Sequence, residues 1–252
     1  MDSQRHAGRT AVVTGAGSGI GRATVIRLAQ EGAHVVGCDI DEAALSVTRG
    51  ELVAAGLQAS LEQVDVTNQA DIDRLLVAIS EPVDLLANVA GIMDHFVPLS
   101  EVDDSSWERV LSVNLTGVMR LTRAVLPGMQ QAGSGAIVTV ASEASLRAGA
   151  AGAAYTTSKH AVIGLVKHVA YFYGPLGIRS NAVLPGAVAT GIGASSVPTS
   201  EWAMERAMAA LATMGSVAEP GQIASAISWL GCDEASNING AIVTADGGWS
   251  TA

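Results

Sequence analysis

The sequence predicts an α/β fold, a Rossmann-type doubly wound parallel sheet of seven strands with helices on both faces. Short runs rich in β-branched residues alternate with helical segments along the 252 residues. Several runs are apolar at successive positions, as in 11–13 and 136–138, which is typical of strands covered on both faces. The predicted strands are 10–14, 34–38, 58–64, 83–87, 136–141, 178–184 and 241–245.

Glycine and proline positions support the helices between these strands. Gly32 and Gly56 each follow a helical segment, where a left-handed residue commonly ends a helix. Pro220, directly after Glu219, occupies the favoured first position of a further helix. The two longest helical patterns, 104–131 and 155–173, are expected to pack beside each other on one face of the sheet. The helical segments include 20–31, 41–55, 104–131 and 155–173.

Composition limits the domain count and the class of partner. No linker interrupts the chain, so we expect a single domain over residues 1–252 with its core at 10–249. A formal charge of −10 without a Lys/Arg cluster argues against nucleic acid and favours a small-molecule partner. The polar amino terminus and the lack of a long apolar run predict a cytoplasmic protein without membrane contact. Cys38 and Cys232 lack metal-ligand spacing, so no metal site is expected.

A glycine-rich turn joins the first predicted strand to the first predicted helix. Glycines at this place let the backbone approach a phosphate group closely at a helix amino terminus. Their spacing is GxxxGxG rather than the common GxGxxG. Because the turn ends a strand and opens an amphipathic helix, it predicts a dinucleotide site rather than a plain tight turn. The residues expected to hold the diphosphate are Gly15, Ser18, Gly19, Ile20 and Gly21.

Asp39, at the end of the second predicted strand, predicts NAD as the cofactor. A carboxylate there accepts hydrogen bonds from the adenosine ribose and repels the 2′-phosphate of NADP. No Arg or Lys lies between Asp39 and Leu45, and the turn carries Ser18 rather than a basic residue. The alternative is that Asp39 or Asp41 only caps the next helix. Further cofactor contacts are expected at later strand ends, from Asp65, Val66, Asn88, Ala90, Gly91, Pro185 and Gly186.

Tyr155 and Lys159 are four residues apart in a helical segment and so share one face, about one turn apart. Moving the pKa of a phenol from ~10 to ~7 takes about 4 kcal/mol. A positive charge at ~4 Å in an effective dielectric of ~20 supplies about that much, and an oxidised nicotinamide adds a second cation. The pair therefore predicts a tyrosine general base at neutral pH.

Two further polar residues precede this pair. Ser142 ends the fifth predicted strand, where its hydroxyl could hold a substrate oxygen in line with Tyr155. A serine nucleophile is less plausible, because no GxSxG motif surrounds Ser142. Asn114 interrupts an apolar helical stretch. It either binds a water that links Lys159 to solvent or is a satisfied buried side chain that bridges backbone groups.

Together these motifs resemble the short-chain dehydrogenase/reductase family in its short single-domain form. The resemblance covers Thr10 to Trp249, and the order and spacing of the motifs agree. Val89 is the one departure, at a position where the family usually has Asn or Ala. The matching motifs are TGxxxGIG at 14–21, NVAG at 88–91, Asn114, Ser142, YxxxK at 155–159 and PGxxxT at 185–190.

The resemblance implies a role for each residue. Tyr155 would be the acid/base, and Lys159 would bind the nicotinamide ribose and lower the tyrosine pKa. Ser142 would position the substrate, and Asn114 would hold the relay water. Thr190, with Val188 nearby, would bind the nicotinamide carboxamide. The resemblance also implies a homotetramer with much of its contact through the two long helices.

The substrate pocket is expected after the fourth to sixth strands and within a substrate-binding loop with short helices at 187–215. The candidate lining is mostly apolar, which favours a small, fairly hydrophobic secondary alcohol or ketone, cyclic or aryl. A β-ketoacyl thioester of a carrier protein or CoA is the alternative substrate, disfavoured by Asp39 and the acidic surface. A non-catalytic nucleotide-sensing protein on the same fold is a third possibility. Besides Ser142 and Tyr155, the predicted substrate contacts are Met93, His95, Glu143 and Trp202.

Overall fold

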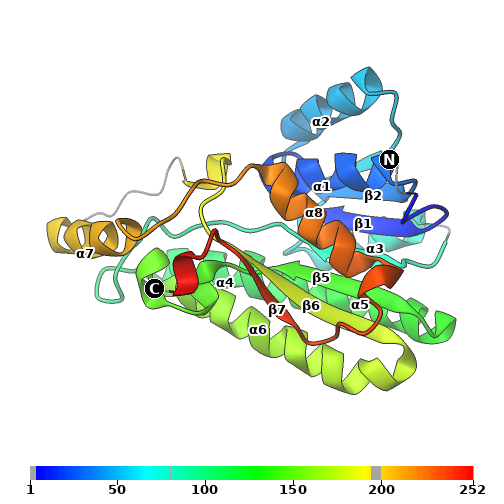
Figure 1. Cartoon of the computed structure of the whole chain (residues 1–252). Coiled ribbons are helices and arrows are strands. Elements are labelled where there is room, and N and C mark those ends of the chain that lie inside the picture. Colours follow the sequence, from blue (N-terminus) through cyan, green and yellow to red (C-terminus); the bar gives the residue numbers. More distant parts are fainter. Residues whose placement is uncertain (1–3, 80, 194–199, 252) are drawn as a thin grey trace.

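The computed structural model describes residues 4–79, 81–193 and 200–251. Its centre is a seven-stranded sheet in the order β3-β2-β1-β4-β5-β6-β7, and every neighbouring pair is parallel (Figure 1). This arrangement confirms the predicted fold class. The strands are β1 (Thr10–Thr14), β2 (His34–Asp39), β3 (Ser60–Gln63), β4 (Leu85–Asn88), β5 (Gly135–Val140), β6 (Ile178–Pro185) and β7 (Ile242–Ala245).

Helices cover both faces of the sheet (Figure 1). One apolar core lies under α1, α2 and α8, and a second lies under α3, α5 and α6. Ala11 and Val13 of β1 enter the first core, and Val12 enters the second, so successive apolar residues of this strand are all buried. The helices are α1 (Gly19–Gln30), α2 (Glu42–Ala54), α3 (Gln69–Ala78), α4 (Asp104–Leu111), α5 (Val118–Ala132), α6 (Ala153–Tyr173), α7 (Glu201–Leu211) and α8 (Pro220–Gly231).

One predicted helix differs from the structure. The pattern over 104–131 predicts a continuous α-helix, but a π-helical turn at Ser112–Gly117 separates α4 from α5. Such wide turns are uncommon and often lie at functional sites. No α-helix in the described part of the chain is both long and apolar enough to cross a lipid bilayer.

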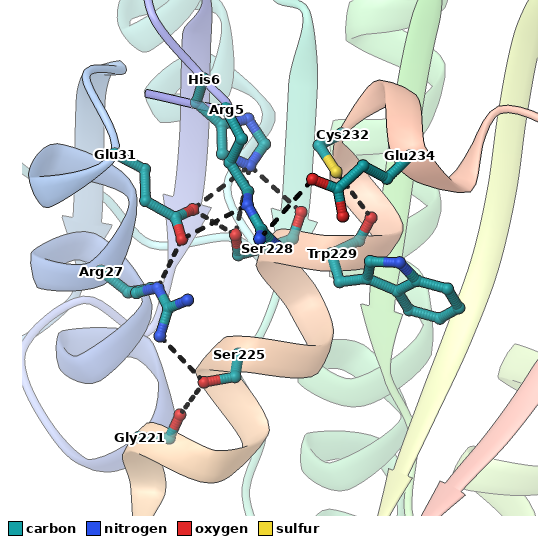
Figure 2. A network of polar contacts seen from close by, with 10 residues as sticks. All are labelled: Arg5, His6, Arg27, Glu31, Gly221, Ser225, Ser228, Trp229, Cys232 and Glu234. Atoms are coloured by element: carbon teal, nitrogen blue, oxygen red, sulfur yellow. Dashed lines mark hydrogen bonds and ion pairs between the residues drawn. The ribbon is translucent and has the colours of Figure 1, made fainter. Parts of the chain in front are cut away.

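The amino-terminal segment is fixed to α1 and α8 by a buried polar network (Figure 2). Nε2 of His6 lies 3.1 Å from the carbonyl oxygen of Ser228, and the Ser228 hydroxyl donates to the carboxylate of Glu31. Arg27 and Arg5 pair with the same carboxylate at 2.6 and 3.7 Å. His6 is completely buried, and burial lowers its pKa below the ordinary value of 6.5.

This network predicts a loss of stability in mild acid. Because the folded pKa of His6 is lowered, the unfolded chain binds the proton first as the pH falls below about 6.5. The contribution of His6 to the free energy of unfolding should therefore be constant above pH 7 and decline below 6.5, with a slope of at most about 1.4 kcal/mol per pH unit. Glu31 opposes the shift, whereas Arg5 and Arg9 add to it.

Urea unfolding at pH 7.5 and 5.5 measures this loss. His6→Gln keeps a donor for the Ser228 carbonyl and cannot titrate, so its loss between the two pH values should be smaller than that of the wild type. His34→Gln, at an exposed histidine, is the matched control and should behave as the wild type. An equal loss in His6→Gln and wild type would contradict the prediction.

Candidate active site

The glycine-rich turn at the end of β1 is shaped for a group that approaches the backbone. Gly15 and Gly19 have φ of +70° and +50°, values that side chains disfavour. A Cβ on Gly21 would lie 1.9 Å from the carbonyl oxygen of Gly15, so α1 packs directly onto the turn. Ser18, the N-cap residue, does not cap the helix with its side chain. The first-turn N–H groups therefore form a cradle suited to a diphosphate.

Thr14 connects this turn to the loop after β4. Its buried Oγ1 accepts hydrogen bonds from the N–H groups of Val89 and Ala90, each at 2.9 Å. The side chain of Asn88 contacts the core, where its Nδ2 lies 3.3 Å from Thr122 Oγ1 and 3.5 Å from Thr139 Oγ1; its predicted cofactor contact stays a prediction. The side chain of Asn88 thus joins β4 to α5 and β5. Thr14 is the first residue of the TGxxxGIG motif, but the sequence does not show that it holds the loop after β4.

Asp39, at the end of β2, is hydrogen-bonded to the glycine-rich turn. Its Oδ2 accepts from the Gly17 N–H at 2.9 Å, and its Oδ1 accepts from the Asp41 N–H at 3.0 Å. The helix cap belongs to Asp41, which accepts from the Ala44 N–H at 3.1 Å. Of the two aspartates named in the capping alternative, Asp41 therefore caps α2 and Asp39 does not.

Two more predicted cofactor residues lie after β3, beside the π-helical turn. Oδ1 of Asp65 accepts from the N–H and the hydroxyl of Thr67 at 2.8 and 2.7 Å, which closes the turn after the strand. Val66 packs against Gly117, since a Cβ on that glycine would lie 2.9 Å from Val66 Cγ2. The loop after β3 and the π-helical turn are thus in direct contact.

The loop after β6 lies over the glycine-rich turn. Gly186 follows Pro185 and packs on Asp246, and Val188 forms a β-bridge with Ala218. Thr190 Cγ2 would lie 2.8 Å from a Cβ on Gly19. The buried Oγ1 of Thr190 has no hydrogen-bond partner among the described residues. A nicotinamide dinucleotide between this loop and the turn fits such an unsatisfied hydroxyl, because buried polar atoms normally have a partner.

Ser142, Tyr155 and Lys159 meet near the carboxyl end of β5. The Tyr155 and Ser142 hydroxyls are hydrogen-bonded to each other, and the Ser142 oxygen also accepts from the Ala144 N–H at 3.1 Å. The Lys159 ammonium donates to the carbonyl of Val140 at 2.9 Å and lies 5.5 Å from the centre of the Tyr155 ring. One helical turn and one strand end thus place the three groups together, as the spacing predicts.

Burial dominates the electrostatics of this group. Desolvation raises the pKa of Tyr155 to about 12, although the bond from Ser142 acts in the opposite direction. Desolvation also lowers the pKa of Lys159 to about 8. Burial of the phenol thus outweighs the attraction expected from the Lys159 charge, and the further contribution expected from oxidised nicotinamide stays a prediction. The neutral phenol is a proton donor.

Asn114 lies in the π-helical turn and is fully buried. Its Oδ1 accepts from the N–H of Ile92, and its Nδ2 donates to the carbonyl of Ile92, both at 2.9 Å. Nδ2 also lies 3.2 Å from Ser158 Oγ. Asn114 Oδ1 and Lys159 Nζ would lie 3.3 and 3.4 Å from a Cβ on Gly91, so the three residues converge. The side chain thus performs the structural bridge weighed from the sequence, and its role in a water relay stays a prediction.

The predicted substrate contacts do not all meet. Met93 packs in the apolar cluster that contains Tyr155, and the buried carboxylate of Glu143 pairs with Arg147. His95 is exposed, and Trp202, 54% exposed, lies on α7, which projects from the body of the molecule (Figure 1). Within the predicted loop 187–215, residues 194–199 lie outside the described residues.

Comparison with known proteins identifies the family. A family model described as enoyl-(acyl carrier protein) reductase matches residues 15–250. The 3β-hydroxysteroid dehydrogenase 2 of Eggerthella lenta is 41% identical over 258 residues, which cover 99% of both chains. The chain belongs to the short-chain dehydrogenase/reductase family. The cis-4-hydroxycyclohexanecarboxylate dehydrogenase of Sinomonas cyclohexanicum is 40% identical over 250 residues, 98% of each chain.

Solved structures agree with this assignment. A 3-oxoacyl-[acyl-carrier protein] reductase with bound NAD from Brucella melitensis superposes with a TM-score of 0.87 at 31% identity, over 100% of this chain and 94% of that one. The solved relatives include NADP-bound as well as NAD-bound proteins. As a member of the short-chain dehydrogenase/reductase family, the chain is an oxidoreductase that uses a nicotinamide cofactor.

Proposed function

We propose that this enzyme interconverts a secondary alcohol and a ketone with NAD(H), and that Tyr155 is the general acid/base. The observation that carries the proposal is the hydrogen-bonded pair of Tyr155 and Ser142 hydroxyls with the buried Lys159 ammonium behind it. All three lie at the same edge of the sheet as the glycine-rich turn, where parallel α/β sheets bind their ligands. A proton donor and a cofactor site at one edge suit carbonyl reduction.

Each side chain has a definite task in this proposal. In the reductive direction the neutral Tyr155 donates its proton to the carbonyl oxygen, while the Ser142 hydroxyl holds the same oxygen. In the oxidative direction Tyr155 must first ionise, which the positive charge of Lys159 favours. The nicotinamide, when bound, supplies or accepts the hydride. Asn114 keeps the loop after β4 in place behind Lys159 through its two bonds to Ile92.

The choice of NAD rests on Asp39. Its carboxylate is directed at Gly17 of the turn. A 2′-phosphate on the adenosine ribose would meet this negative charge, whereas ribose hydroxyls would donate to it. Thr190, with its unsatisfied hydroxyl, would hold the carboxamide.

Asp39→Asn tests this choice, because it removes the charge and keeps an oxygen for the Gly17 N–H. We expect the ratio of kcat/KM for NADH to kcat/KM for NADPH to fall at least about tenfold. Asp41→Asn changes the same functional group two residues away and should leave the ratio unaltered. A ratio in Asp39→Asn equal to that of the wild type would show that another group selects the cofactor.

The proposed substrate is a fairly hydrophobic cyclic secondary alcohol or its ketone. Met93 and the apolar cluster around Tyr155 support this, as do the two relatives whose names specify a hydroxysteroid and a hydroxycyclohexane. Residues 187–215 are the proposed substrate loop. A panel of cyclic ketones, with and without a carboxylate, assayed with NADH tests the proposal. If the enzyme turns over none of these ketones, the proposal is rejected.

A β-ketoacyl thioester is the second candidate substrate. The family model and the solved reductase from Brucella melitensis, both described by acyl-carrier-protein substrates, favour it. Acetoacetyl-CoA in the same panel distinguishes the two, since an enzyme for thioesters should reduce it with a higher kcat/KM than any cyclic ketone. The homotetramer and the cytoplasmic location remain predictions.

A further inference from the structure

Asp94, six residues after the end of β4, is a buried carboxylate close to Tyr155. Its exposed fraction is 4%. Burying a carboxylate is costly unless hydrogen bonds compensate it. Both oxygens accept from backbone N–H groups, Oδ1 from Gly152 at 3.0 Å and Oδ2 from Tyr155 at 2.8 Å. The acceptor and its donors are 58 and 61 residues apart, so this contact is a feature of the tertiary structure.

These donors belong to the first turn of α6. Gly152 is the N-cap residue and has no side chain with which to cap the helix. Asp94 supplies the missing acceptor from another segment, and its negative charge lies at the positive end of the helix dipole. The carbonyl of Val97 accepts from the Ala153 N–H at 3.0 Å in the same turn. The loop after β4 therefore fixes the start of the helix that carries Tyr155.

The backbone around Asp94 is built for this contact. His95 and Phe96 both have positive φ, 57° and 58°, a conformation that residues other than glycine seldom adopt. The N–H of Val97 returns to the Asp94 carbonyl at 3.2 Å and closes this turn. A Cβ on Gly152 would lie 2.7 Å from each Asp94 oxygen and 2.5 Å from Val97 N. Strained backbone that persists beside a functional group is commonly part of its mechanism.

We infer that Asp94 is a positioning residue, which holds the Tyr155 backbone against the loop after β4, the loop that Thr14 ties to the proposed cofactor site. The inference rests on the proposed acid/base role of Tyr155. The same loop is tied to Thr14 at Val89 and Ala90 and to Asn114 at Ile92. Asp94 thus sets the distance between the tyrosine and the loop after β4. Small displacements of a reacting group cost large factors in rate.

The charge of Asp94 also acts on the phenol. Among the described residues, the charged or polar groups that face Tyr155 are Lys159 on its own helix, Ser142 after β5 and Asp94 after β4. Asp94 makes ionisation of the phenol harder, which raises its pKa. Removing that charge should therefore move the acidic limb of the pH profile for alcohol oxidation toward lower pH.

Three variants distinguish the effect of Asp94 on the position of Tyr155 from the effect of its charge on the phenol. Asp94→Asn should lower kcat about tenfold, shift the acidic limb to lower pH and leave the Kd for NAD within about twofold. Asp94→Glu should lower kcat by a similar factor without moving the limb, because it displaces the helix and keeps the charge. Asp103→Asn, at the exposed acid that caps α4, is the matched control and should change neither quantity.

The assay uses the full chain, with the active ketone or alcohol of the panel and NAD(H), and circular dichroism to establish folding. An unchanged kcat in both Asp94 variants overturns the inference, as does a limb that stays in place in Asp94→Asn. If Asp94→Asn does not fold, Asp94→Glu still decides the positional part. Tyr155→Phe assayed in parallel tests the proposed function separately, because its full activity would reject the acid/base role whatever the Asp94 variants do.

Discussion

Tyr155→Phe should lower kcat about 10³-fold, within the range that a positioned acid/base contributes. The substitution removes one hydroxyl and keeps the ring, so packing with Ala154 and Val110 in the same apolar cluster is preserved. Ser142 cannot replace the lost group, because an aliphatic hydroxyl hardly ionises in water. A loss of 10³ corresponds to about 4 kcal/mol of transition-state stabilisation.

Steady-state kinetics and NAD titration together test this prediction. The Kd for NAD should stay within about threefold of the wild-type value, because the glycine-rich turn and Asp39 are untouched. Tyr171→Phe, at a tyrosine 78% exposed on the same helix, is the matched control and should keep full activity. If Tyr155→Phe retained more than a tenth of wild-type kcat, a different residue would transfer the proton. If wild type and variant both bound NAD but turned over no member of the panel, the result would favour the non-catalytic nucleotide-sensing role.

The local part of the site could be predicted from the sequence. Tyr155 and Lys159 share a helix face because their spacing equals about one helical turn. Gly15, Gly19 and Gly21 follow a buried strand and open a helix, and each is required by positive φ or by close backbone approach. Such relations involve neighbouring residues and the regular geometry of strands and helices. A pattern of residue types is sufficient to specify them.

The remaining features depend on contacts between distant segments. Asn114 interrupts the apolar pattern of 104–131, which indicates a buried polar contact, but neither its partner Ile92 nor the π-helical turn can be read from that pattern. Asp94 resembles any loop acid in sequence until α6 is placed against it. The side chain of Asn88 faces the core because Thr122 and Thr139, from two other elements, converge on it.

The pKa of Tyr155 shows the same limit for energetics. An ion-pair estimate from the sequence has to assume a distance and a dielectric constant, and it contains no cost for burying either group. In the structure the lysine lies 5.5 Å from the ring centre and donates to Val140. Burial disfavours the charged form of both groups. The pKa of Tyr155 in the structure is therefore far above the value that the ion-pair estimate gives. Burial is a property of the folded chain.

Gly21→Ala should weaken NAD binding by at least about 100-fold, which equals about 3 kcal/mol. The added methyl carbon would lie 1.9 Å from the carbonyl oxygen of Gly15 and 2.4 Å from its carbonyl carbon. These are backbone atoms, so relief requires α1 to move away from the turn. That movement separates the first-turn N–H groups from the diphosphate they would hold.

Isothermal titration with NAD, together with thermal unfolding, measures this effect on folded protein. Gly50→Ala makes the same chemical change in the exposed part of α2, where nothing lies within 4 Å of the new methyl group. It should bind NAD as the wild type does and gain about 0.5–1 kcal/mol of stability from helix propensity. Wild-type affinity in Gly21→Ala would show that the contact between α1 and the turn does not shape the site. A loss confined to Gly21→Ala would tie cofactor affinity to that contact, independently of any residue that transfers the proton.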